Sequence, residues 1–115
     1  MAKAKIEEFT VEESELADIA KALSHPARLK ILKILSQMDV CMCGEIVDLL
    51  PLAQATVSQH LKELKRVGFI KGTIEGPKMC YCIDTIAIQK YYGIIKSYFE
   101  NISKECKSSC KPQTN

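Results

Sequence analysis

The sequence contains few of the features that usually identify an enzyme. Its 115 residues include only two histidines and five glycines. No Cys-x-x-Cys, no phosphate-binding glycine loop and no set of nucleophile, base and acid is present. The cysteines form Cys-x-Cys and Cys-x-x-x-Cys pairs, whereas a zinc ribbon repeats Cys-x-x-Cys. We therefore expect neither an enzyme, such as a thiol oxidoreductase or a metal-dependent hydrolase, nor a structural zinc module.

Long hydrophobic runs are also missing from the sequence. No stretch approaches the roughly 20 apolar residues that cross a bilayer, and the first residues lack the apolar run of an export signal. We therefore expect a cytoplasmic protein whose six cysteines are reduced thiols, available to metals or oxidants. A chain of this length fits one domain with a modest core, so a second copy is expected to cover part of its apolar surface.

The charges are unevenly distributed along the chain. Residues 1–20 are mainly acidic, and residues 53–78 carry Lys62, Lys65, Arg66, Lys71 and Lys78 against only Glu63 and Glu75. Such a basic segment is typical of a surface that binds nucleic acid, although a solvated helix face would have a similar composition.

The spacing of hydrophobic residues predicts five helices and a hairpin. We expect helices at 13–23, 26–38, 45–50 and 53–67, a hairpin formed by 69–75 and 78–83, and a helix from 84 or 85 to 102. These elements form one domain, 13–102, between an acidic extension, 1–12, and a cysteine-containing tail, 103–115. The first and last helices carry apolar stripes that one domain cannot bury, which predicts a two-fold dimer. The predicted interface residues are Leu16, Ile19, Leu23, Tyr91, Ile95 and Phe99.

A short helix, a turn, a helix with a polar face and a basic hairpin together indicate a winged helix-turn-helix. Side chains at the start of the second helix can enter the major groove, where glutamine bonds adenine and serine or threonine bonds base edges or phosphate. Lysine and arginine supply contacts to phosphates. The predicted DNA-binding residues are Gln54, Thr56, Ser58, Gln59, His60, Lys62, Lys65, Arg66 and Lys78.

Three runs carry a resemblance to a known family: His25-Pro-Ala-Arg-Leu-Lys-Ile-Leu, Ala55-Thr-Val-Ser-Gln-His-Leu-Lys-Glu-Leu-Lys-Arg-Val-Gly-Phe-Ile and Glu75-Gly-Pro-Lys-Met-Cys-Tyr-Cys-Ile. Over residues 13–102 the sequence resembles the ArsR/SmtB repressors of bacteria and archaea. The resemblance implies a mainly α winged helix-turn-helix (ααααββα) that forms a homodimer through its first and last helices. It also implies that the dimer binds an inverted-repeat operator in double-stranded DNA and leaves it when an inducer binds. By the same resemblance residues 53–67 form the recognition helix and His60 contacts DNA, although histidines at a helix edge often pack instead.

Cys41 and Cys43 lie just before the expected third helix. Because peptide N–H groups at a helix start favour negative charge, we expect these thiols to ionise readily. Thiolates are soft ligands that suit As(III), Sb(III), Cd, Pb or Zn. In the family a corresponding Cys-x-Cys serves metal- and metalloid-sensing members, so the resemblance implies Cys41 and Cys43 as the primary inducer site, with As(III) or Sb(III) favoured and no organic cofactor.

The sequence departs from the family's best-known metal sites. The arsenic-sensing type can supply a third cysteine where this chain has Ile46. The cadmium-sensing type uses N-terminal cysteines, which residues 1–38 lack. The family's zinc site in the last helix is also absent, because Asp84-Thr-Ile86 begins a helix without histidine. A third ligand must therefore come from Cys80, Cys82, Cys106, Cys110 or a donor outside the protein.

The remaining cysteines leave further possibilities open. Cys80 and Cys82 are two apart on a strand, so they share one face, opposite Met79, Tyr81 and Ile83. Cys106 and Cys110 are four apart and would share a helix face, which makes them the second choice for the inducer site. The alternative function is a redox- or persulfide-sensing repressor of the same fold, controlled by a reversible Cys41–Cys43 or Cys106–Cys110 disulfide.

Overall fold

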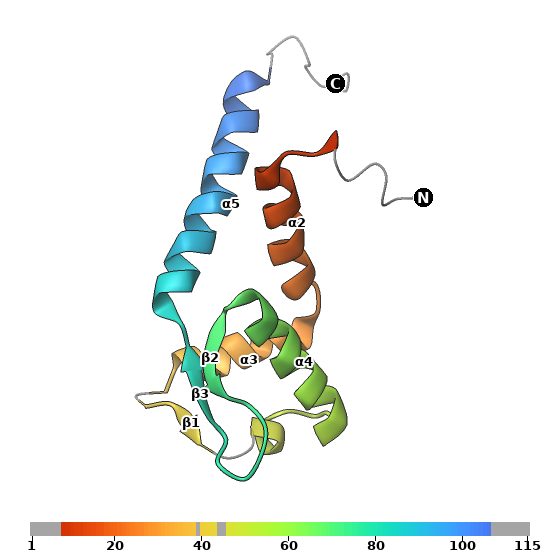
Figure 1. Cartoon of the computed structure of the whole chain (residues 1–115), viewed down its shortest axis with the longest axis vertical. Coiled ribbons are helices and arrows are strands. Elements are labelled where there is room, and N and C mark those ends of the chain that lie inside the picture. The colour runs from red at the N-terminus through yellow and green to blue at the C-terminus, as the bar shows by residue number, and fades with distance from the viewer. Residues whose placement is uncertain (1–7, 39, 44–45, 107–115) are drawn as a thin grey trace, which may run out of the picture.

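The computed structural model describes residues 8–38, 40–43 and 46–106. The elements in chain order are α2 (Val11–Ala22), α3 (Pro26–Ser36), β1 (Met42–Cys43), the 3₁₀ helix η2 (Ile46–Leu49), α4 (Gln54–Val67), β2 (Ile70–Thr73), β3 (Cys80–Ile83) and α5 (Thr85–Glu105). Figure 1 shows α2 beside α5 at one end of the molecule, and α3, α4 and the sheet at the other. The predicted mainly helical fold with a β-hairpin is confirmed.

Short sequence signals set the ends of the helices. Thr10 begins α2 with a capping box, in which its Oγ1 accepts from the Glu13 N–H and its own N–H donates to Glu13 Oε1. Asp84 caps α5 by accepting from the N–H groups of its first turn. Gly68 ends α4 at a φ of 93°, a left-handed conformation that glycine adopts without a Cβ clash. The predicted end of the helix over 53–67 and the predicted start of the last helix at 84 or 85 are thus confirmed.

The sheet has one strand more than the sequence predicted. Its order is β1-β3-β2, with both neighbouring pairs antiparallel. At two residues, β1 is too short to produce a detectable alternation of apolar and polar positions. The segment expected to form a helix over 45–50 is a 3₁₀ turn over 46–49.

The hydrophobic core lies between α2, α3, α4 and the inner face of the sheet. Tyr81, Ile31 and Leu64 are fully buried in it. Ile19 on α2 is only 2% exposed and packs in the core of its own chain, while its predicted place in a dimer interface stays a prediction. Phe99 on α5 is 57% exposed, and no described residue of α5 is buried. None of the described helices is long and apolar enough to span a membrane.

Candidate functional site

Helix α4 presents a polar face beside the wing. Its apolar residues Val57, Leu61 and Leu64 point into the core, and most of the predicted DNA-binding positions on the helix are exposed, Thr56 and Gln59 among them. The N-cap residue, Ala53, provides no capping side chain for the N–H groups of the first turn. Uncapped N–H groups at a helix start are suited to a phosphate oxygen.

The side chain of His60 does not lie on the exposed face of α4, and its predicted contact with DNA stays a prediction. The residue is only 6% exposed, and its Nδ1 accepts a hydrogen bond of 3.1 Å from Nε of Arg28. Its ring lies 4.4 Å from the ring of His25, centroid to centroid. Burial, followed by the charges of His25 and Arg28, lowers the pKa of His60 from 6.5. His60 follows Val57 by three residues, so it lies at the edge of the buried face of α4. Its side chain therefore supports the helix on the side that faces the core.

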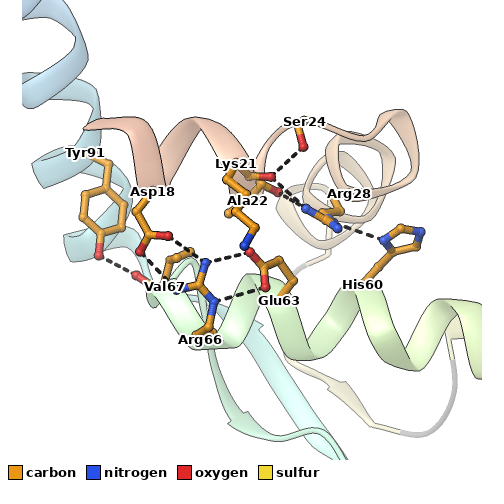
Figure 2. A network of polar contacts seen from close by, with 10 residues as sticks. All are labelled: Asp18, Lys21, Ala22, Ser24, Arg28, His60, Glu63, Arg66, Val67 and Tyr91. Carbon is orange, nitrogen blue, oxygen red and sulfur yellow. Dashed lines mark hydrogen bonds and ion pairs between the residues drawn. The ribbon is translucent and has the colours of Figure 1, made fainter. Parts of the chain in front are cut away.

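Arg28 is a residue that the sequence reasoning did not single out. Its Nη1 donates to the carbonyl oxygens of Lys21 at 2.8 Å and Ala22 at 3.3 Å, while its Nε reaches His60 (Figure 2). Arg28 therefore joins the end of α2 to the middle of α4. The only sequence signal for this role is its place in the run that begins at His25.

Arg66 forms a second link between α2 and α4, seen in Figure 2. Its guanidinium donates to both oxygens of Asp18, at 2.9 and 3.0 Å, and to both oxygens of Glu63, at 3.1 and 2.7 Å. The hydrogen bonds from Arg66 hold the pKa values of Asp18 and Glu63 below their usual range. Arg66 is one of the residues predicted to contact a phosphate of DNA. Because both carboxylates already bind its guanidinium, a phosphate would have to compete with them.

The other predicted cations lie between α4 and the wing. Lys62 forms an ion pair of 3.3 Å with Glu75, and Lys65 donates to the carbonyl oxygen of Gly72. The predicted wing contact, Lys78, is exposed. The basic side chains of α4 thus reach toward the hairpin, so the helix and the wing form one continuous surface.

The sheet brings together cysteines that are about forty positions apart in the sequence. In the β1–β3 ladder Cys43 pairs with Cys80 and Met42 with Tyr81. Continuing this register by one residue brings Cys41 opposite Cys82. The Cys41 and Cys82 thiols share a hydrogen bond, and this contact is the main cause that raises the pKa of Cys82. Lys71, opposite Cys82 on β2, counteracts the rise. Cys82, one of the possible third ligands, is therefore a direct neighbour of Cys41.

The predicted cysteine pairs have different outcomes. Cys41 and Cys43 lie at a strand rather than at the start of a helix, because η2 is a single 3₁₀ turn. Cys80 is disulfide-bonded, so the expectation that all six cysteines are reduced thiols is wrong for this residue. Cys106 is exposed at the end of α5, and Cys110 lies outside the described residues. Within the part of the chain that the structure describes, no three histidine, cysteine, aspartate or glutamate side chains form a group that could hold a metal.

A groove of about 690 Å³ opens next to the Cys41–Cys82 pair. It runs between α3, the segment leading into β1, and the junction of β3 with α5. Most of its lining is apolar and includes Leu29, Leu32, Met38, Val40 and Ile88. Both thiols are part of this lining. The pair therefore faces an apolar space and not only solvent.

Comparison with known proteins agrees with this geometry. Residues 23–73 match a family of helix-turn-helix domains. The chain is 35% identical over 92 residues to the transcriptional repressor PagR of Bacillus anthracis, covering 80% of this chain and 87% of PagR. It is also 35% identical over 71 residues to a homologue of the cadmium resistance transcriptional regulatory protein CadC of Staphylococcus aureus, covering 61% of this chain and 58% of that protein.

The fold has a counterpart among solved structures. An ArsR-like transcriptional regulator from Rhodococcus superposes with a TM-score of 0.63 at 21% identity, covering 81% of this chain and 87% of the other. The relatives are DNA-binding transcriptional regulators and not enzymes, which confirms the expectation for this chain. The protein therefore belongs to the ArsR/SmtB family of helix-turn-helix transcriptional regulators.

Proposed function

We propose that the protein is a homodimeric cytoplasmic repressor that leaves its operator when a thiophilic metalloid or metal binds Cys41 and Cys82. The observation that carries the proposal is the contact between these two thiols. The ligand class follows from their chemistry, because soft thiolates suit As(III) and Sb(III), and also Cd, Pb or Zn. The similarity to a cadmium resistance regulator supports a metal-responsive function.

The DNA-binding part of the proposal rests on the exposed face of α4. We propose that Gln54, Thr56, Ser58 and Gln59 face the major groove of an inverted-repeat operator, with the lysines of α4 and Lys78 near phosphates. His60 acts through the helix, because its buried ring and its bond to Arg28 fix the position of α4. Leu16, Leu23, Tyr91, Ile95 and Phe99 remain the proposed dimer contacts, and the exposed aromatic surface of α5 supports them.

The position of the thiol pair suggests how ligand binding could weaken DNA binding. Cys82 lies on β3, whose one end leads back into the wing and whose other end continues through Asp84 into α5. A ligand that joins Cys41 to Cys82 would fix β1 against β3, and so bias the wing and the proposed dimer helix together. Allosteric couplings of this kind are typically about 1–3 kcal/mol, which corresponds to a five- to 150-fold change in operator affinity.

Operator release under reducing conditions tests this proposal. Arsenite, antimonite and cadmium are titrated into a complex of the protein with operator DNA, and release is followed by fluorescence anisotropy. Cys41→Ser and Cys82→Ser should each abolish the response while leaving DNA binding intact. Cys106→Ser is the matched control, because this exposed residue lies at the far end of α5. If none of the three ligands releases the DNA, or if Cys106→Ser alone abolishes release, the proposed inducer site is wrong.

A redox-sensing repressor is the second candidate, and the disulfide at Cys80 is the observation that favours it. Exposed thiols near a disulfide can exchange with it or be oxidised by persulfides. Mass spectrometry after mild oxidation, combined with an operator-binding assay, distinguishes the two functions. If oxidation abolishes DNA binding and a dithiol restores it, the result would support redox sensing. If arsenite releases the DNA without oxidation of the cysteines, the result would support metalloid sensing.

A further inference from the structure

The chemistry of the groove beside the thiol pair narrows the class of inducer. We propose that this site takes a trivalent metalloid that carries an apolar organic group, such as an aryl arsenic(III) compound. The two thiols hold the arsenic, and the groove holds the organic group. This inference rests on the proposed function, since it concerns the same thiol pair, and it adds a reason for selecting among thiophilic ligands.

The groove wall differs from that of a site for a bare ion. Leucines of α3 contribute to the lining, together with Met38 and Val40 from the segment before β1, Ile83 of β3 and Ile88 of α5. Lysine, serine and threonine contribute only Lys33, Ser36 and Thr85 to the lining. A charged or strongly hydrated ligand would lose hydration against such a wall, whereas an aromatic ring would gain free energy by leaving water.

The dimensions allow an aromatic group to be bound. An enclosed apolar cavity of about 150 Å³ lined by leucine, isoleucine and phenylalanine binds benzene. The groove, at about 690 Å³, is several times larger and opens to the surface. Cys41 and Cys82 are part of the groove lining. A phenyl ring bonded directly to an arsenic held by their thiols can therefore occupy the groove.

The thiol pair also matches the number of exchangeable ligands on such a compound. In water an aryl arsenic(III) compound carries two hydroxyl groups and one arsenic–carbon bond. Each thiol replaces one hydroxyl, so that two As–S bonds form, two As–O bonds break, and both thiol protons leave in two water molecules. No electron is transferred and the As–C bond persists. Arsenite on the same two thiols would keep one hydroxyl and would place no apolar group against the groove wall.

Binding of phenylarsine oxide and of arsenite to the reduced protein tests the proposal. Dissociation constants come from competition with a small dithiol, and operator release is measured in parallel. We expect phenylarsine oxide to bind about tenfold more tightly than arsenite, because burying a ring removes apolar area from water. Leu29→Gln should reduce this ratio about threefold or more, with little risk to folding because Leu29 is 52% exposed.

A matched variant separates the groove from a general effect of polarity. Leu49 is 51% exposed but lies on η2, outside the groove, so Leu49→Gln should leave the ratio unchanged. Cys82→Ser should weaken binding of both ligands, since each needs the thiol pair. Equal affinities, a preference for arsenite, or equal effects of the two glutamine variants would overturn the inference while leaving the proposed function standing. Failure of both ligands to bind the reduced protein would overturn both.

Discussion

Replacing Gly72 with alanine tests how the wing is built. Gly72 has a φ of 109°, and a Cβ on it would overlap the carbonyl oxygen of Cys80 and lie 2.9 Å from Cα of Tyr81. The unusual backbone conformation alone costs an alanine about 1–2 kcal/mol. The overlap also forces β2 away from β3, and each backbone hydrogen bond lost costs about 1 kcal/mol. We therefore expect Gly72→Ala to lower the free energy of unfolding by about 3 kcal/mol or more.

Gly76 provides the matched control for this substitution. Its φ is 89°, but a Cβ there would meet no atom within 4 Å, so Gly76→Ala has the conformational cost without the overlap. Urea unfolding followed by circular dichroism gives both changes, and the difference between them isolates the contact between strands. The strand separation should also weaken metalloid binding by moving Cys82 relative to Cys41. Equal destabilisation by the two alanines would refute this account of the hairpin.

Three further predictions concern the polar network between α2, α4 and α5. Asp18→Asn leaves Arg66 with Glu63 as its only carboxylate partner, so operator affinity should rise and its salt dependence should steepen, by up to about one unit of log–log slope. Because the pKa of His60 is lowered from 6.5, the unfolded chain takes up its proton first as the pH falls below 6.5, so stability is full above that value and declines toward acid. Urea midpoints across this range should show the decline, and His60→Gln should remove most of it. Tyr91→Phe removes the hydrogen bond from the Tyr91 hydroxyl to the carbonyl of Val67, and should cost about 1 kcal/mol in thermal or urea unfolding.

Local signals predicted the helices because local chemistry determines where helices end. The proline at the first position of α3, the glycine after α4 and the aspartate before α5 act within one turn of chain, so the sequence shows them directly. The strand β1 escaped prediction for the opposite reason. It exists only because β3, about forty residues later, offers it a partner, and pairing over such a distance leaves no periodic pattern in two residues.

The face of a side chain was less predictable than the position of its helix. His60 and Arg66 both belong to the polar sequence of α4, and both were expected to meet DNA. His60 is instead buried against Arg28, and Arg66 is bound by Asp18 from α2. Arg28 and Asp18 lie more than thirty residues away along the chain. Helical periodicity therefore placed Glu63 next to Arg66 but could not supply these two distant partners. Polar character alone therefore did not show that these two side chains have partners within the protein.

The inducer site shows how the tertiary fold changes the chemistry that a motif suggests. Cys41-x-Cys43 in the sequence suggests a chelate formed by neighbours, but the thiol that contacts Cys41 is that of Cys82 on β3. A chelate between Cys41 and Cys82 would connect the strand before the helix-turn-helix with the strand that leaves the wing. Ligand binding would then depend on the relative positions of these two parts of the fold. This dependence is our reason for proposing the cross-strand pair as the site that controls DNA binding.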